Sequence, residues 1–206
     1  MPRRCRLAPW KLTREHLGTA GTAWVALAAV LAAGSLLAWI TPPEAWLWRR
    51  DAPAQAWRWW SGALVHLNGL HLAANLAGVA VVAALGAGAR LPWQAATAWA
   101  IAWPLTQAGL WLAGSPSRYG GLSGVLHAGV AVAASFMICG TERQQRLLGI
   151  GIALGLAAKI TVEAPWLAAV RPGPWWGFPV VVGAHFSGAL AGLAVAMASL
   201  GLQRSR

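Results

Sequence analysis

Four polar side chains lie in segments that are otherwise almost entirely apolar, and their types could support nucleophilic catalysis. Ser123 stands between glycines in "GGLSGVLHAG", His185 stands in "GAHFSGALAG", and His71 and Asn75 are four residues apart in "GLHLAANLAG". Serine becomes a good nucleophile when a base takes its proton, and histidine is the usual base near neutral pH. The oxyanion that forms when serine attacks an amide needs donors aimed at it, and imidazole, carboxamide and helix-start backbone N–H groups can supply them.

Small residues beside these side chains would let the helices that carry them approach closely. Gly121 and Gly124 flank Ser123, so no Cβ stands between the serine backbone and a substrate. Gly188 follows His185 and begins a G-x-x-x-G pattern, which brings membrane helices together backbone to backbone. We therefore expect a hydrogen bond between the serine and the histidine across two closely packed helices.

Other polar residues of the apolar segments have structural interpretations. His127, four residues after the serine, shares its helical face and is expected to support or position the site rather than to transfer protons. His66 is expected to anchor a loop. Lys159 and Glu163 are four residues apart, and we expect a structural ion pair that hides both charges from lipid, with gating or substrate contact as the alternative. No acidic residue is then within reach of the base, and the predicted catalytic group is a Ser–His dyad.

The composition predicts that this group lies in a membrane. Of the 206 residues, 58% are hydrophobic and 10% are charged, and the mean hydropathy is +0.54. Five acidic and sixteen basic residues cannot form the polar surface that a soluble domain of this length needs. The net charge of +11 is spread over short connectors and tails, as in membrane proteins that are oriented by their basic residues. We therefore predict a lipid bilayer and no nucleic acid as partner.

Hydropathy predicts an all-α polytopic membrane protein with six transmembrane helices, at 19–40, 62–86, 92–113, 122–139, 146–165 and 178–201. They form one domain over residues 19–201, between a basic tail at 1–18 and a short tail at 202–206. The first apolar run is longer than a signal-peptide core and no clear cleavage site follows it, so we expect it to be retained. Cys5 and Cys139 are too few for a disulfide framework and too separate for a metal site, and we expect neither cofactor nor metal.

The basic residues also predict the orientation. With the N-terminus inside, the inner segments carry ten of the sixteen basic residues and the outer loops carry five, which favours both termini in the cytoplasm. The second, fourth and sixth spans then begin at the outer face and place Ser123, His185 and His71 at one depth. Because a polar group that faces lipid is costly, these side chains are expected to face one another or a water-filled cavity.

The same motifs resemble those of the rhomboid intramembrane serine proteases over nearly the whole chain. In chain order the matching motifs are Trp57-Arg58, His66-x4-His71-x3-Asn75, Gly121-x-Ser123-Gly124 and Ala184-His185-x-x-Gly188-x-x-x-Gly192. The stretches "HLNGLHLAANLAG" and "GLSGVLHAG" and the Lys159-x-x-x-Glu163 spacing are similar to the rhombosortase branch of that family. Many rhomboids carry a tyrosine four residues after the serine, where this chain has His127.

The resemblance implies a rhomboid-like fold and a cofactor-free serine endopeptidase of the bacterial inner membrane, with its active site open to the extracytoplasmic side. It implies Ser123 as nucleophile, His185 as general base and then acid, and an oxyanion hole made by His71, Asn75 and the serine backbone. For rhombosortases it implies a substrate with a C-terminal anchor, which consists of a Gly-Gly-containing motif, one transmembrane helix and a basic cluster. The alternatives are a general rhomboid protease with other transmembrane substrates, an inactive client-binding relative, which would be expected to lack Ser123 or His185, and a small transporter. A transporter would need further carboxylates or ligands near the histidines, and Glu163 is the one acid within a predicted span.

Overall fold

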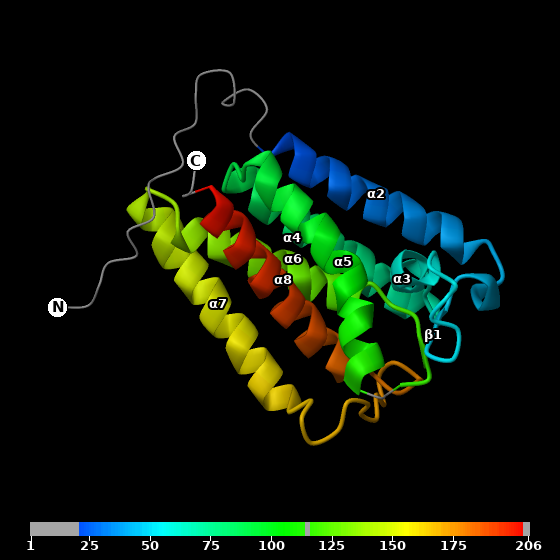
Figure 1. Ribbon diagram of the computed structural model, residues 1–206. Helices are drawn as coiled ribbons and strands as arrows, with labels where there is room; N and C mark the ends of the chain where they lie inside the picture. The colour runs from blue at the N-terminus through cyan, green and yellow to red at the C-terminus, as the bar shows by residue number, and fades with distance from the viewer. Residues whose placement is uncertain (1–20, 114–115, 204–206) are drawn as a thin grey trace.

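The protein is a bundle of helices, seen here in a computed structural model that describes residues 21–113 and 116–203 (Figure 1). The long helices are α2 (Thr22–Trp39), α4 (Gly69–Gly88), α5 (Trp93–Ala113), α6 (Ser123–Ile138), α7 (Arg143–Glu163) and α8 (Val182–Leu202). The predicted all-α class is therefore confirmed for the described part of the chain. The predicted N-terminal tail at 1–18, with Cys5, and the last three residues of the C-terminal tail lie outside the described residues.

The outer surface of the bundle is that of a membrane protein. Four helices, α2, α4, α7 and α8, are long and apolar enough to cross a bilayer. α6 is apolar but has 16 residues, and α5 has 21 residues but is interrupted by glutamine, threonine and proline. Large apolar side chains such as Val81, Leu154 and Val162 are exposed on the outside of the bundle. Such side chains suit lipid, whereas a soluble protein would bury most of them.

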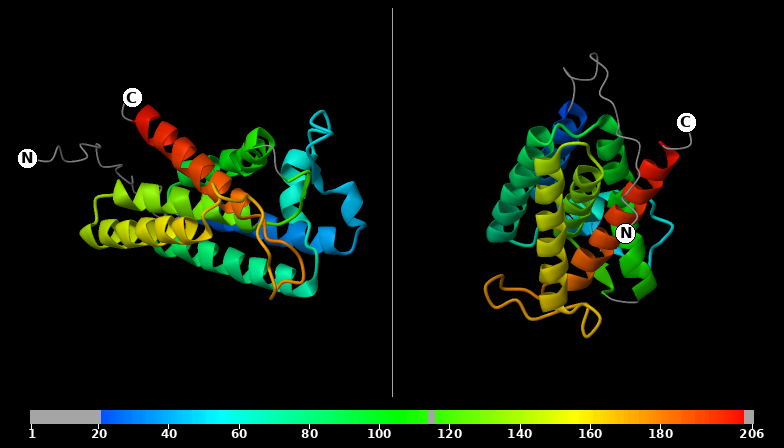
Figure 2. Two further views of the ribbon diagram at one scale, coloured as in Figure 1. Left: turned by 90° about the horizontal axis from the view of Figure 1, so that it is seen from below. Right: turned by 90° about the vertical axis from the view of Figure 1, so that its left-hand side faces the viewer.

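α6 lies at the centre of the bundle. Most of its residues are buried, and it packs against α4, α5, α7 and α8 (Figures 1 and 2). α2 packs against α4 and α5. α7 differs from the others because Gly149 and Ile160 are its only buried residues, so nearly the whole helix faces outward. The start of α6 is therefore positioned by helices on several sides.

α6 and α8 touch through their backbones. A Cβ added at Gly188 would lie 1.9 Å from the carbonyl oxygen of Gly124, and one at Gly192 would lie 2.3 Å from that of Ala128. Neither position has room for a side chain. The close approach predicted by the G-x-x-x-G pattern is thus observed, and it brings Gly188 and Gly192 of α8 against Gly124 and Ala128 of α6.

Short elements close the end of the bundle at which α4, α6 and α8 begin. They are η1 (Pro43–Ala45), β1 (Trp48–Arg49), α3 (Arg58–Ser61), η2 (Gly62–Leu64) and β2 (Arg118–Tyr119). β1 and β2 pair in antiparallel fashion, with Trp48 opposite Tyr119. The buried Arg58 side chain donates hydrogen bonds to the carbonyls of Glu44 and Leu47. The two described ends of the chain lie at the other end of the bundle (Figure 1).

The second predicted span begins later than expected, at Gly69 instead of residue 62. Residues 62–64 form η2, and α4 starts after Asn68, whose Oδ1 accepts the His71 backbone N–H at 2.8 Å. Such an N-cap fixes the first residue of a helix. His66 therefore lies in the connection before α4, and the prediction that it lies within a span was wrong.

Candidate active site

Ser123 and His185 contact each other across α6 and α8. Nε2 of His185 lies 3.0 Å from Oγ of Ser123, although 62 residues separate them in the chain. Ser123 is the first residue of α6, and the backbone that leads to it turns at Gly121, whose φ of +149° is rarely adopted by other residues. The His185 side chain is buried, with 8% of its surface exposed. The predicted juxtaposition of a serine and an imidazole is therefore present.

The other ring nitrogen of His185 contacts an acid. Nδ1 lies 2.8 Å from Oε2 of Glu163, and Oε1 of the same carboxylate accepts a hydrogen bond from Nζ of Lys159. The expected Lys159–Glu163 pair is present, but the prediction that no acid reaches the base was wrong. An ion pair within α7 uses one carboxylate oxygen, and the second oxygen remains available to α8. Ser123, His185 and Glu163 thus form a continuous hydrogen-bonded chain.

The end of α7 places Glu163 beside α8. Ala164, the next residue, has φ 43° and ψ 59°, which ends the helix, and a proline follows that disfavours a further helical turn. The Ala164 carbonyl accepts a hydrogen bond from Nη2 of Arg171 at 3.2 Å, which holds the chain after the helix. A carboxylate at a helix C-terminus is repelled by the helix dipole. The contacts with Lys159 and His185 offset this repulsion.

His127 covers one face of the His185 ring. The two ring centroids are 4.3 Å apart and the planes are inclined by 8°. Nδ1 of His127 lies 2.7 Å from the Ser123 carbonyl oxygen, so this nitrogen carries the proton and donates it. The ring therefore has a fixed orientation and packs beside the base, as expected for a supporting residue.

The same residues could be considered as metal ligands. His127, Glu163 and His185 offer one ligand atom each, and these atoms lie within 4.8 Å of one another. However, the two imidazole planes are nearly parallel, so their lone pairs do not converge on one point. Both nitrogens of His185 also have hydrogen-bond partners. The geometry favours a hydrogen-bonded group over a metal centre.

A cavity of about 290 Å³ opens beside Ser123. His71 lines it too, together with apolar residues of the connections such as Leu67 and Phe178. Nδ1 of His71 lies 3.4 Å from the Leu67 backbone N–H and acts as acceptor, so the proton of the neutral ring is on Nε2. A Cβ built on Gly121 would lie 3.1 Å from this Nε2. A donor of the predicted oxyanion hole therefore lies beside the backbone that leads to Ser123.

Asn75, the second predicted oxyanion donor, is not among the described residues that line this cavity. Its side chain is buried, and Nδ2 donates to the His71 carbonyl at 3.1 Å, within α4. A carboxamide has two N–H groups, so one remains after this contact. The structure thus brings His71 to Ser123 and keeps Asn75 one turn further along α4.

A nucleophile in contact with a base beside a cavity is the arrangement that covalent catalysis requires. No protein-family model and no curated protein matches this chain. The function of the site is therefore inferred from the chemistry of Ser123, His185 and His71.

Two residues that the sequence analysis missed, Tyr119 and Asn68, donate hydrogen bonds to backbone carbonyls of the segments around the cavity. The buried Tyr119 donates its hydroxyl to the Gly121 carbonyl at 2.6 Å, and burial raises the pKa of Tyr119 to about 12, so the phenol stays protonated near neutral pH. Asn68 donates from Nδ2 to the Trp176 carbonyl at 2.7 Å, which ties the connection between α7 and α8 to the start of α4. An asparagine directly before an apolar helix is an N-cap signal that could have identified Asn68. We find no sequence signal for Tyr119.

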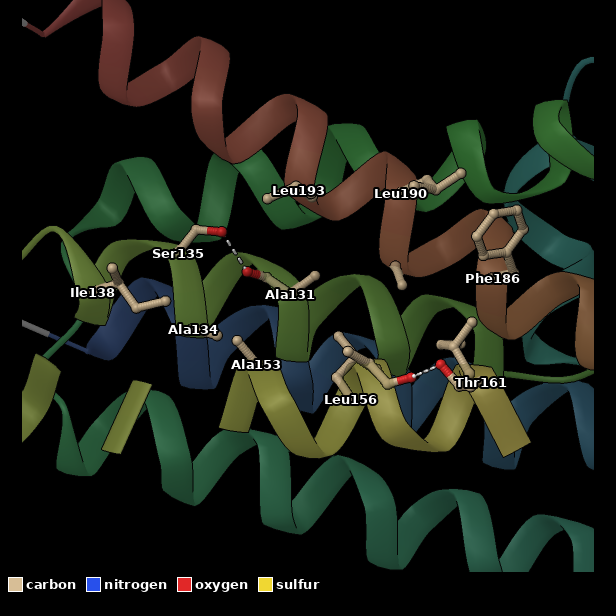
Figure 3. Close-up of a pocket in the computed structure, with 13 residues that line it drawn as sticks. Ala131, Ala134, Ser135, Ile138, Ala153, Leu156, Thr161, Phe186, Leu190 and Leu193 are labelled. Atoms are coloured by element: carbon tan, nitrogen blue, oxygen red, sulfur yellow. Dashed lines mark hydrogen bonds between the residues drawn. The ribbon is translucent and has the colours of Figure 1, made fainter. Parts of the chain in front are cut away.

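A second cavity, of about 360 Å³, lies further along α6, between α6, α7 and α8 (Figure 3). Its walls are apolar, with side chains such as Ile138, Leu156 and Leu193. The hydroxyls of Ser135 and Thr161 are turned to carbonyls of their own helices, at 2.8 and 2.9 Å. The residues that line this cavity therefore offer no catalytic group.

Proposed function

We propose that this protein is an intramembrane serine endopeptidase of the rhomboid type. The observation that carries the proposal is the 3.0 Å contact between Ser123 Oγ and His185 Nε2, beside a cavity that is also lined by His71. The four helices that could cross a membrane support it, as does the order of the motifs along the chain. The proposal includes a rhomboid-like fold with six spanning helices, in which α5 and α6 are the third and fourth.

The proposed reaction begins when Oγ of Ser123 attacks the carbonyl carbon of a peptide bond while its proton passes to Nε2 of His185. The resulting oxyanion accepts hydrogen bonds from the Ser123 backbone N–H and from Nε2–H of His71, with the free N–H of Asn75 as a further donor. His185 then gives its proton to the leaving amine, and an acyl ester of Ser123 remains. Water, deprotonated by His185, hydrolyses the ester and restores the serine. No cofactor or metal takes part.

The substrate that we propose is a membrane-anchored exported protein, cut near the outer face of the bacterial inner membrane. The distribution of basic residues supports cytoplasmic termini, which would turn the starts of α4, α6 and α8 to the outside. The rhombosortase-like motifs support a C-terminal anchor that contains a Gly-Gly motif.

A serine-directed probe tests the catalytic group. In detergent, a fluorophosphonate should label the wild type, while Ser123→Ala and His185→Ala should both remain unlabelled. Ser135→Ala is the matched control, because it removes a hydroxyl from the same helix that is bonded to the Ala131 carbonyl, and it should be labelled like the wild type. Equal labelling of Ser123→Ala and the wild type would overturn the proposal.

Two co-expressed reporters test the substrate class. One carries a C-terminal Gly-Gly motif, a transmembrane helix and a basic cluster, and in the other both glycines are replaced by valine. Ser123-dependent cleavage of the first reporter alone supports the rhombosortase type, and equal cleavage of both supports a general rhomboid protease. Cleavage that is the same with wild type and Ser123→Ala would count against a protease.

A further inference from the structure

We propose that Glu163 is a positioning residue for His185, and that Lys159 sets the orientation of Glu163. The inference rests on the proposed function, since it assigns a role within the Ser123–His185 pair. Its basis is the chain of contacts that runs from Lys159 Nζ to Glu163 Oε1, from Oε2 to His185 Nδ1 at 2.8 Å, and from Nε2 to Ser123 at 3.0 Å.

The first step of the argument concerns the tautomer of His185. To take the proton of Ser123, Nε2 must be unprotonated, so the neutral ring must carry its proton on Nδ1. An ionised carboxylate can only accept hydrogen bonds. Because Glu163 Oε2 faces Nδ1, it holds the ring in the tautomer that can act as a base. After the serine proton has moved to Nε2, the imidazolium keeps both protons and the adjacent carboxylate stabilises its charge.

The second step concerns Lys159. An ammonium group can only donate, and its contact with Oε1 turns Oε2 toward His185. The side chain of Glu163 is 18% exposed and that of Lys159 is 48% exposed. Lys159 therefore contacts the Glu163 carboxylate from the more exposed surface of the helix bundle. Among the described residues, His127 is a further titratable group in direct contact with His185, and it donates from Nδ1 to the Ser123 carbonyl and so does not compete for Glu163. His71 lines the cavity from α4, and because its Nδ1 accepts the Leu67 backbone N–H, the proton of its neutral ring is on Nε2.

Glu163→Gln should reverse the tautomer. The carboxamide has one accepting and one donating end, and Lys159 binds the accepting oxygen. The NH₂ group then faces His185 Nδ1 and donates to it, which places the ring proton on Nε2. A base in this tautomer cannot take the serine proton, and we expect the rate of fluorophosphonate labelling and kcat for the anchored reporter to fall about a hundredfold or more.

The double variant Lys159→Met/Glu163→Gln separates positioning from a structural ion pair. Without the ammonium, the carboxamide can turn its oxygen to Nδ1 and restore the productive tautomer. We expect it to label about tenfold or more faster than Glu163→Gln, although it still lacks the carboxylate charge. Lys159→Met alone keeps the carboxylate, which can still only accept from Nδ1, but it removes the donor that turns Oε2 toward His185, so it should label more slowly than the wild type and faster than Glu163→Gln.

Nitrogen NMR of protein with ¹⁵N-labelled histidine reads the tautomer directly, with the His185 signal assigned from His185→Ala. We expect the proton on Nδ1 in the wild type, on Nε2 in Glu163→Gln, and again on Nδ1 in the double variant. If Glu163→Gln does not fold, the neutral double variant carries the test, and a proton on Nε2 there would overturn the inference.

Two outcomes separate this inference from the proposed function. A folded Glu163→Gln protein that labels at the wild-type rate, or keeps the proton on Nδ1, would overturn the role of Glu163 while Ser123-dependent labelling of the wild type still stands. A wild type without Ser123-dependent labelling would overturn the proposed function itself, whatever tautomer His185 has.

Discussion

Gly188 of α8 lies so close to Gly124 of α6 that an added Cβ would be 1.9 Å from the Gly124 carbonyl oxygen. The contact involves the residue that follows Ser123 and the one three positions after His185. Backbone contact at this point therefore sets the distance at which the serine and the imidazole meet. The separation of the two side chains depends on helix packing as much as on their own rotamers.

Gly188→Ala should push the two helices apart. Because the new methyl group would meet a backbone oxygen and not a flexible side chain, we expect a loss of about 1–3 kcal/mol in stability. The rate of fluorophosphonate labelling should fall about tenfold or more, since a small displacement breaks the Ser123–His185 contact. Thermal unfolding in detergent and labelling rates test both effects.

Gly155→Ala is the control for this substitution. Nothing lies within 4 Å of a Cβ at Gly155 in α7, so the same change of residue should cost neither stability nor labelling. A Gly188→Ala protein that unfolds and labels like the wild type would show that the helices can separate without consequence.

The stacked ring of His127 should matter through its shape. Phenylalanine keeps a flat ring on His185, so His127→Phe should label at close to the wild-type rate, whereas His127→Ala should label about 2- to 10-fold more slowly. The two rings are 4.3 Å apart and nearly parallel, which is the contact that the alanine removes. An equal loss in both variants would instead implicate the hydrogen bond from His127 Nδ1 to the Ser123 carbonyl.

The oxyanion donor is tested by His71→Ala. If Nε2–H of His71 stabilises the transition state, kcat for the anchored reporter should fall about 10²- to 10³-fold while KM changes little. His66→Ala is a useful comparison, because His66 packs on His71 with ring centroids 4.9 Å apart but is not among the residues that line the cavity. It should alter stability more than kcat, and the reverse result would mean that the two histidines were assigned wrongly.

The sequence predicted the helices well because their apolar runs are continuous. It misplaced the start of the second span, since hydropathy counts the apolar residues of η2 and does not register the cap at Asn68. His66 was counted as a span residue for the same reason.

The sequence could not place Glu163 beside His185. The i,i+4 spacing predicts an ion pair between Glu163 and Lys159 within one helix, which already gives the acid a partner. The hydropathy of α7 does not determine how that helix is rotated relative to α8. Only the assembled bundle shows that one carboxylate oxygen faces the lysine and the other faces the imidazole. Tyr119 was missed because its hydrogen-bond partner is a backbone carbonyl, which every residue has and which therefore leaves no pattern in the sequence.

Tyr119→Phe should destabilise the loop that precedes Ser123. The phenol hydroxyl donates to the Gly121 carbonyl at 2.6 Å, and its removal leaves a buried acceptor without this donor. Such a loss costs about 1–3 kcal/mol. We expect a lower unfolding temperature and slower labelling, and a variant that matches the wild type in both would exclude a role for this hydrogen bond.

The ionisation of Tyr119 gives the same contact a pH signature. Tyr119 is the only tyrosine in the chain and lies in β2, outside the long helices, so alkaline difference absorbance reports on it alone among tyrosines. Burial raises its pKa from 10.0 to about 12, so the folded protein should titrate near pH 12 and the unfolded chain near pH 10. Because the unfolded state loses the proton first, the stability of the wild type should fall between these two pH values, and Tyr119→Phe should lack this part of the decrease. A phenol that titrates near pH 10 in the folded protein would mean that Tyr119 is open to solvent and does not hold the Gly121 carbonyl.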